Sequence, residues 1–168
     1  MRKILHRSNS LLPGLVVLLF AAAGCGGGGR TSTNADAKLT LTAGAGYNGS
    51  SVRFSGDPTS SVTNGTTVVL VTQGARTFRI VLPTATPQNN DQFTVGQNGT
   101  SASYSEASFS LPVPDRVWNG TGGTVDVQFL RNTLFLTLND VQFAADSSNG
   151  SQAQGTFSVS GTITNIEF

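Results

Sequence analysis

The chain has little of what most enzymes use for chemistry. Its 168 residues include one histidine, His6, and one cysteine, Cys25. Both lie in a leading segment that we expect to be removed or chemically modified. The remainder therefore lacks Ser-His-Asp and Cys-His nucleophilic machinery and histidine-ligated zinc. A single cysteine also allows no internal disulfide. We expect a protein that is not an enzyme and that needs no metal or cofactor.

Charge is scarce as well, at 11% of residues. Ten basic side chains face nine acidic ones in the full chain. Arg2, Lys3 and Arg7 lie in the leading segment, so without it seven basic side chains face nine acidic ones. No basic cluster is left, which excludes nucleic acid as an expected partner.

The longest apolar run, 11–23 (LLPGLVVLLFAAA), follows these basic residues directly. A basic segment, a short apolar segment and small residues in that order are typical of a secretory signal. A helix that spans a bilayer needs about 20 apolar residues, and Pro13-Gly14 interrupts this run. The pattern therefore predicts export rather than a permanent transmembrane helix.

Two processing sites compete at the end of this run. Ala21-Ala22-Ala23 suits ordinary signal peptidase. Ala22-Ala23-Gly24-Cys25 resembles the lipobox of bacterial lipoproteins, although Ala22 stands where leucine is commonest. The resemblance implies that Cys25 is acylated and anchors the protein to a lipid bilayer, since two or more acyl chains hold firmly. Gly26 follows instead of the aspartate that retains lipoproteins at the inner membrane. The expected location is therefore the bacterial cell envelope, with the outer membrane slightly favoured in an organism that has one.

The rest of the chain divides in two. Residues 26–37 (GGGGRTSTNADA) show no periodicity and almost no bulk, which predicts a flexible linker after Cys25. The resulting organisation is a signal peptide over 1–24, the lipidated cysteine and linker over 25–37, and a single all-β domain over 38–168.

The domain shows no helical pattern beyond about one turn. Short alternating segments are separated instead by turn dipeptides, and their number predicts nine to ten strands in an antiparallel β-sandwich or a small barrel. Asn-Gly pairs suit type I′ hairpin turns, because both residues tolerate positive φ. We interpret them as turns rather than glycosylation acceptors; they begin at Asn48, Asn64, Asn98, Asn119 and Asn149.

Two hairpins can be predicted to the register. A turn at Gly74-Ala75 places Val71 opposite Phe78 and Val69 opposite Ile80, with Val68 meeting Val81 and Leu70 meeting Arg79 on the other face. Because both faces are largely apolar, we expect this ribbon to be covered on both sides. A turn at Arg131-Asn132 pairs Phe129 with Leu134, Val127 with Leu136 and Val125 with Leu138.

The apolar alternation slips by one residue at two places, across Asn139-Asp140 and near Asn165. Such a slip predicts a β-bulge. Further short strands are expected over 38–43, 51–55, 92–96, 102–110 and 154–161, followed by a separate final strand from Thr162 to Phe168.

The candidate ligand-binding residues are aromatic. In one interpretation an exposed Trp118, helped by Tyr104 and Tyr47, stacks on a glycan or on an envelope protein. In the other, which we favour, Trp118 packs in the core.

Acidic residues offer weaker candidates. Glu106, Asp126 and Asp140 could supply a pair of carboxylates for glycoside hydrolysis, although acids on a solvated strand face explain them better. Asn89-Asn90-Asp91 and 146–149 contain oxygen ligands for calcium, but their spacing favours turns.

The stretch 118–168, with WNGTGGTV, LTLNDVQF and GTFSVSGTI, resembles the C-terminal half of small β-sandwich lipoproteins of bacteria. The resemblance implies a fold but no activity. We therefore expect an anchored, non-enzymatic domain with a binding or structural role. The alternatives are a lipocalin-like barrel that carries an apolar ligand and a carbohydrate-active domain.

Overall fold

The computed structural model describes residues 30–31, 35–50, 53–107, 115–148 and 150–168. The described residues form strands and loops, and no helix among them is long and apolar enough to cross a membrane. The strands are β1 (Arg30–Thr31), β2 (Asp36–Ala43), β3 (Arg53–Thr63), β4 (Thr66–Gln73), β5 (Arg76–Leu82), β6 (Gln92–Thr94), β7 (Ser101–Glu106), β8 (Arg116–Leu130), β9 (Thr133–Ala145) and β10 (Thr156–Glu167).

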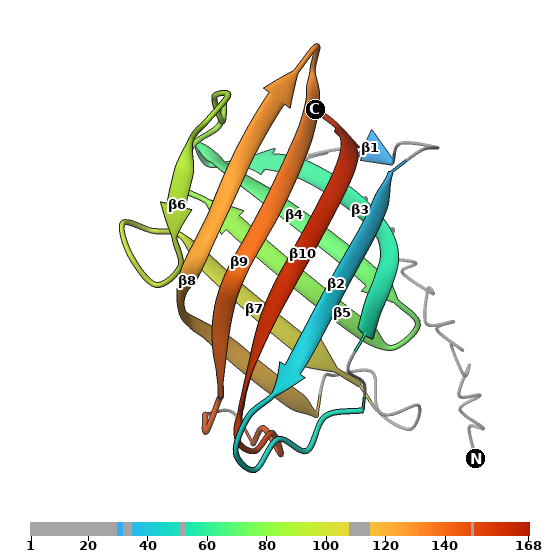
Figure 1. The fold of residues 1–168 in the computed structure, drawn as a ribbon, viewed down its shortest axis with the longest axis vertical. Helices are drawn as coiled ribbons and strands as arrows, with labels where there is room; N and C mark the ends of the chain where they lie inside the picture. The colour runs from blue at the N-terminus through green and yellow to red at the C-terminus, as the bar shows by residue number, and fades with distance from the viewer. Residues whose placement is uncertain (1–29, 32–34, 51–52, 108–114, 149) are drawn as a thin grey trace, which may run out of the picture.

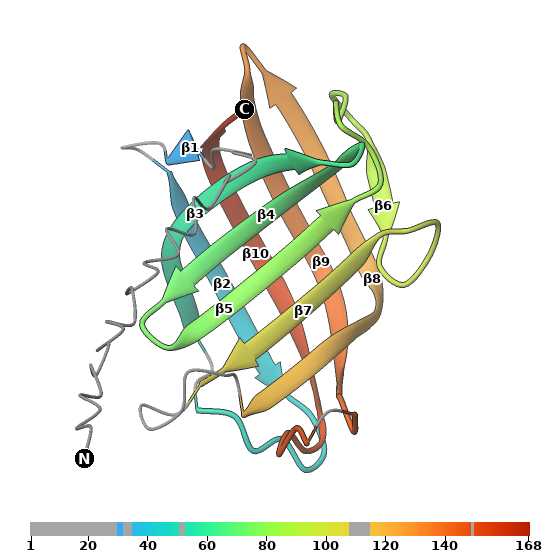
Figure 2. The same cartoon turned by 180° about the vertical axis from the view of Figure 1, so that it is seen from behind.

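The strands close into a barrel. From β2 to β10 each strand except the short β6 pairs antiparallel with the next such strand along the chain, and β10 returns to pair with β2. The sequence left two architectures open, a β-sandwich and a small barrel. The closed ladder of strands shows that the fold is the barrel. Figures 1 and 2 show it flattened, with β2, β10, β9 and much of β8 crossing β3, β4, β5 and β7 at a steep angle.

Both hairpin registers are confirmed. Val71 pairs with Phe78 and Val69 with Ile80 across a turn in which Gly74 alone has positive φ. The second hairpin places Val127 opposite Leu136, as predicted. Local turn chemistry and period-2 alternation were sufficient for both predictions.

The expected cover on both sides of the first hairpin is wrong. Val69 and Val71 are fully buried, whereas Val68 and Leu70 on the outer face are half-buried. In a barrel only the inner face of a strand faces the core, so apolar side chains on the outer face stay partly in contact with water.

Both bulges are confirmed. The pairing of β9 with β10 shifts between Val159 and Gly161, opposite Asn139-Asp140, and again between Ile163 and Ile166. Asp140 and Asn165 take the positive φ values of 47° and 56° that accommodate the extra residue.

The Asn-Gly turns are confirmed in part. Asn64-Gly65 joins β3 to β4 and Asn98-Gly99 lies in the turn before β7, all with positive φ. The turn predicted at Asn119-Gly120 is wrong, because these residues lie inside β8. Asn48-Gly49 lies in the loop from β2 to β3 without positive φ, and Asn149 lies outside the described residues.

Other boundaries differ from the expectation. The segment 154–161 and the final strand are one strand, β10, because a bulge rather than a turn separates their apolar residues. Within the expected linker, β1 pairs with Ser60 and Thr59 of β3, and β2 begins at Asp36.

The core fills the barrel with apolar side chains. Along β7, β8 and β9 inward residues alternate with partly exposed ones, as the pleat requires. Phe143 stacks on Phe157, with ring centroids 4.8 Å apart. The largest fully buried side chains are Trp118, Tyr104, Phe54, Phe78 and Phe143.

Candidate functional site

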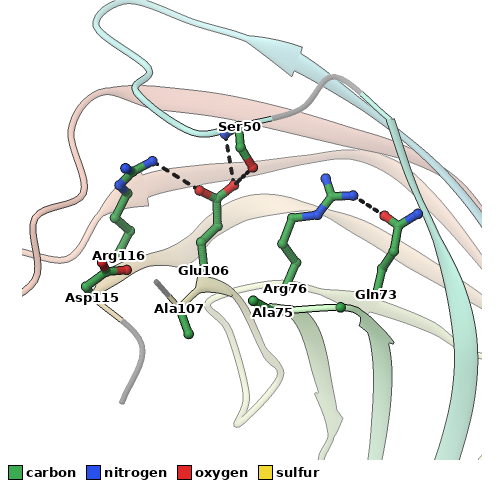
Figure 3. Close-up of a pocket in the computed structure, with 9 residues that line it drawn as sticks. Ser50, Gln73, Ala75, Arg76, Glu106, Ala107, Asp115 and Arg116 are labelled. Atoms are coloured by element: carbon green, nitrogen blue, oxygen red, sulfur yellow. Dashed lines mark hydrogen bonds and ion pairs between the residues drawn. The ribbon is translucent and has the colours of Figure 1, made fainter. Parts of the chain in front are cut away.

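A pocket of about 400 Å³ opens at the end of the barrel where β7 ends and β8 begins (Figure 3). The β4–β5 turn borders it, and so does the loop that follows β2. The lining combines charged and polar side chains with apolar surface, and consists of Ser50, Gln73, Gly74, Ala75, Arg76, Glu106, Ala107, Asp115 and Arg116.

Glu106 is the buried acid of this pocket. It follows Ala102 and Tyr104 on the inward face of β7, so the strand's alternation turns its carboxylate into the barrel, where the residue is 6% exposed. The register of β7 with β8 sets Arg116 directly opposite. A cation beside a buried carboxylate is what makes its burial tolerable.

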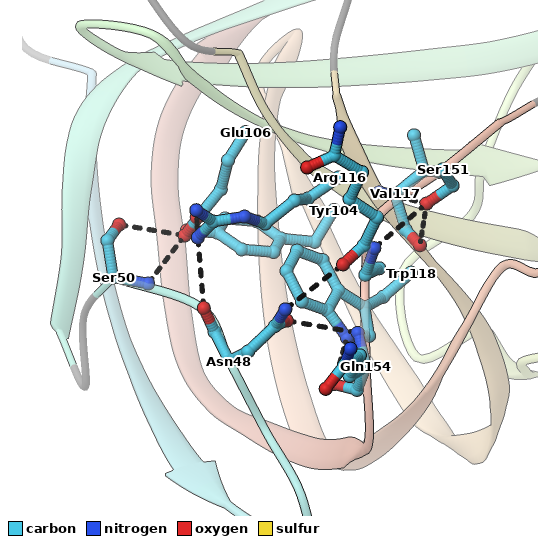
Figure 4. Close-up of polar contacts among 11 residues, drawn as sticks. Asn48, Ser50, Tyr104, Glu106, Arg116, Val117, Trp118, Ser151 and Gln154 are labelled. Carbon is cyan, nitrogen blue, oxygen red and sulfur yellow. Dashed lines mark hydrogen bonds and ion pairs between the residues drawn. The ribbon is translucent and has the colours of Figure 1, made fainter.

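Both oxygens of the Glu106 carboxylate are engaged (Figures 3 and 4). Oε1 accepts hydrogen bonds from the backbone N–H of Ser50 at 3.0 Å, from the Ser50 hydroxyl at 2.8 Å and from the Tyr104 hydroxyl at 2.8 Å. Oε2 accepts one from Arg116 Nη1 at 3.2 Å. The carboxylate is thus a fixed acceptor that joins the loop after β2 to two barrel strands.

Asn48 extends this network to the loop before β10 (Figure 4). Its backbone oxygen accepts from Arg116 Nη1 at 2.9 Å. Its side-chain amide donates to Gln152 O and accepts from Gln154 N, both at 3.0 Å. Two loops that are more than 100 residues apart in sequence are therefore tied together across this end of the barrel.

The second cation of the pocket, Arg76, also has partners. Its guanidinium lies 5.3 Å from the centre of the Phe54 ring and donates to Gln73 Oε1 and Arg53 O. With Glu106 and Asp115 beside Arg76 and Arg116, the pocket carries charges of both signs in equal number. A small polar ligand suits such a surface better than an ion of one sign.

Trp118 and Tyr104 lie inside the barrel, both 0% exposed. Trp118 and Tyr104 therefore do not form the exposed aromatic surface that one interpretation of the sequence expected. Their rings lie 5.7 Å apart, and the Trp118 indole N–H donates to Gln154 O at 3.1 Å. They sit directly opposite each other on neighbouring strands and therefore share one face of the sheet, which is the inner face of the barrel. Tyr47, half-buried, packs against Trp118 at 5.4 Å.

The two tyrosine hydroxyls differ in their partners. Tyr104 donates to Glu106, and burial together with that contact raises its pKa. The Tyr47 hydroxyl is buried without a hydrogen-bond partner among the described residues. Burial, and then the charge of Glu106, raise the pKa of Tyr47 to about 12. Both phenols are therefore neutral at physiological pH.

The three acids considered for glycoside hydrolysis do not converge. Asp126 lies ten residues along β8 from Arg116, the partner of Glu106, which is up to about 30 Å at 3.3 Å per residue. It pairs with Gln92 and Asn139 on the outer face. Asp140 is exposed in the β9 bulge. A catalytic pair of carboxylates needs a separation of about 5 to 10 Å.

In the described residues of the two segments considered for calcium, the aspartates accept local hydrogen bonds; Asn149 lies outside the described residues. Asp91 accepts from Gln88 N at 2.7 Å, and Asp146 accepts from the backbone and hydroxyl of Ser148. Asp146 thus forms an Asx turn with the backbone two residues later, whereas Asp91 accepts from a residue three positions before it, within the turn at 88–91. Hydrogen bonding to Ser148 lowers the pKa of Asp146. Among the described residues, no group of three or more acids, histidines or cysteines is placed to hold a metal ion.

Sequence reasoning singled out Glu106, an acid in an otherwise uncharged strand, but missed Ser50, Arg76 and Arg116. Strand register brings Arg76 and Arg116 to Glu106, and the loop after β2 brings Ser50; no local pattern marks these residues. No family model, curated protein or solved structure matches this chain.

Proposed function

We propose that the chain is an exported bacterial lipoprotein that acylated Cys25 anchors to the cell envelope. The barrel is its displayed, non-enzymatic binding domain. Anchoring is supported by the basic segment, the short apolar run and the Ala22-Ala23-Gly24-Cys25 lipobox, the features of the chain most specific to a function.

A binding role is supported by the state of Glu106. A general acid or base must exchange protons with a substrate, whereas the Glu106 carboxylate already accepts four hydrogen bonds from the protein. Such a group can shape a pocket but has little capacity for catalysis. The ligand proposed for the pocket is a small polar group of mixed charge, such as the end of a glycan or a side-chain cluster of an envelope protein.

Cys25→Ser tests the anchor. In bacteria given a radioactive fatty acid, the wild-type protein is expected to be labelled and the variant not, because the thiol is the acceptor of the lipid. Labelled protein is measured after immunoprecipitation. As a matched control, Ser147→Cys in the Cys25→Ser background restores a cysteine away from the lipobox and is expected to stay unlabelled. Equal labelling of wild type and Cys25→Ser would contradict the proposal.

A second candidate function, a lipocalin-like carrier of an apolar ligand, is favoured by the closed barrel of antiparallel strands. The carrier would need space inside, where Trp118, Tyr104 and Phe157 pack ring against ring with centroids 5.5 to 5.8 Å apart. This packing supports a ligand site at the end of the barrel instead.

The fluorescence of Trp118, the single tryptophan, distinguishes the two candidates. Titration with cis-parinaric acid, a fluorescent fatty acid that accepts energy from tryptophan, is expected to quench Trp118 no more than it quenches free N-acetyltryptophanamide. A carrier would instead show saturable quenching at one ligand per protein.

A further inference from the structure

β1, the first described strand, and the β8–β9 turn lie at the same end of the barrel (Figure 1). β1 pairs with β3 at Ser60, and the Ser60 hydroxyl donates to the backbone oxygen of Glu167 at 2.6 Å. Glu167 in turn pairs with Thr133, the first residue after the Arg131-Asn132 turn. A continuous path of hydrogen-bonded strands therefore links the first described strand to the tip of the longest hairpin.

The chain between Cys25 and β1 is short. Only Gly26 to Gly29 separate the cysteine from Arg30. Five residue steps span at most about 18 Å when fully extended. If Cys25 carries the anchor, this end of the barrel must stay close to the bilayer surface.

Among the described residues, two large apolar side chains are exposed. Leu130, 54% exposed, stands at the tip of β8, and Val62, 45% exposed, lies two residues beyond Ser60. Arg131 follows Leu130 in the turn and is also exposed. An apolar side chain next to an arginine suits the interface of a bilayer, where the first enters the acyl boundary and the second meets phosphates.

We propose that the β8–β9 hairpin tip, with Leu130 and Arg131 foremost, docks on the bilayer that holds acylated Cys25. This inference rests on the proposed anchor. One leucine and one arginine bind a membrane weakly by themselves, but the short tether keeps their effective concentration at the surface high. The lipid anchor and the hairpin tip thus both contact the bilayer, and together they hold the barrel in one orientation.

This orientation fixes where the pocket lies. β8 runs from Arg116, beside Glu106, to Leu130 over 15 residues, which is at most about 45 Å because the strand bends along its length. The hairpin tip and the Glu106 pocket occupy opposite ends of the barrel. With the tip on the membrane, the pocket faces away from it and is accessible to ligands outside the bilayer.

Depth-dependent quenching of a fluorophore tests the orientation. Leu130→Cys and, at the pocket end, Ser147→Cys are each introduced into the full chain, and the purified acylated protein is labelled with an environment-sensitive maleimide. Thioether-linked Cys25 does not react. Reconstituted in phosphatidylcholine–phosphatidylglycerol vesicles with a shallow spin-labelled lipid, the label at 130 is expected to be quenched at least threefold more than the label at 147. Unchanged emission of Trp118 verifies the fold of both variants.

Equal quenching at the two positions, or stronger quenching at 147, would overturn the docking inference while leaving the anchor intact. The intact mass of the protein is measured before reconstitution. A mass without acyl chains would overturn the anchor and the docking inference together, so the two failures are told apart.

Discussion

Replacing Gly123 with alanine is expected to lower the free energy of unfolding by about 2 to 4 kcal/mol. Gly123 has a φ of 86° and lies where β8 passes the Asp140 bulge of β9. A Cβ built there would meet the backbone oxygen of Asp140 at 2.3 Å and the Cα of Val141 at 2.5 Å. Neither backbone atom can move without breaking the β8–β9 ladder. Urea denaturation followed by Trp118 emission measures the loss.

The neighbouring glycine supplies the control. Gly122 lies in the same strand without positive φ. The nearest atom to a Cβ built there is Gln142 Oε1, at 3.8 Å, which is an ordinary van der Waals distance. Gly122→Ala is therefore expected to leave the free energy of unfolding within about 0.5 kcal/mol of wild type. Equal losses for Gly122→Ala and Gly123→Ala would show that the bulge does not require a glycine.

Glu106→Ala is expected to cost about 3 kcal/mol of stability. The change leaves the Tyr104 hydroxyl and the Ser50 donors without their acceptor and deprives Arg116 of its ion pair. Loss of one partner of a buried pair typically costs 3 to 5 kcal/mol. The lower value applies here because the Arg116 side chain is 36% exposed and so remains partly hydrated. Thermal and urea unfolding measure the change.

Tyr47→Phe is the matched control in the same cluster. It removes a hydroxyl that is buried but has no partner among the described residues, so the loss of stability is expected to be zero or even a small gain. A Glu106→Ala variant as stable as Tyr47→Phe would contradict the role of Glu106 as the common acceptor of this end of the barrel.

The sequence was sufficient wherever the determining interactions are local. The Gly74-Ala75 and Arg131-Asn132 turns set the register of their hairpins, and alternation on each strand did the rest. The phase slips at Asp140 and Asn165 were visible because a bulge shifts every later side chain to the other face.

Closure of the barrel and assembly of the site could not be predicted in the same way. The pairing that closes the ladder joins β2 to β10, more than 100 residues apart, and no turn between them sets a register. Asn119-Gly120 misled the turn prediction because its surroundings in the sheet, not its own preference, decide its conformation. The contacts of Glu106 with Ser50 and Arg116 likewise depend on tertiary pairing.

The closed ladder also limits how partners can bind. Each of the eight barrel strands has hydrogen-bonded neighbours on both sides, so its backbone groups are not available to an incoming strand. Strand addition at an unpaired edge is a common route to both recognition and aggregation. For these eight strands that route is closed. Apart from the short edge strands β1 and β6, the surfaces left for recognition by a partner are the outward side chains and the loops at the barrel ends.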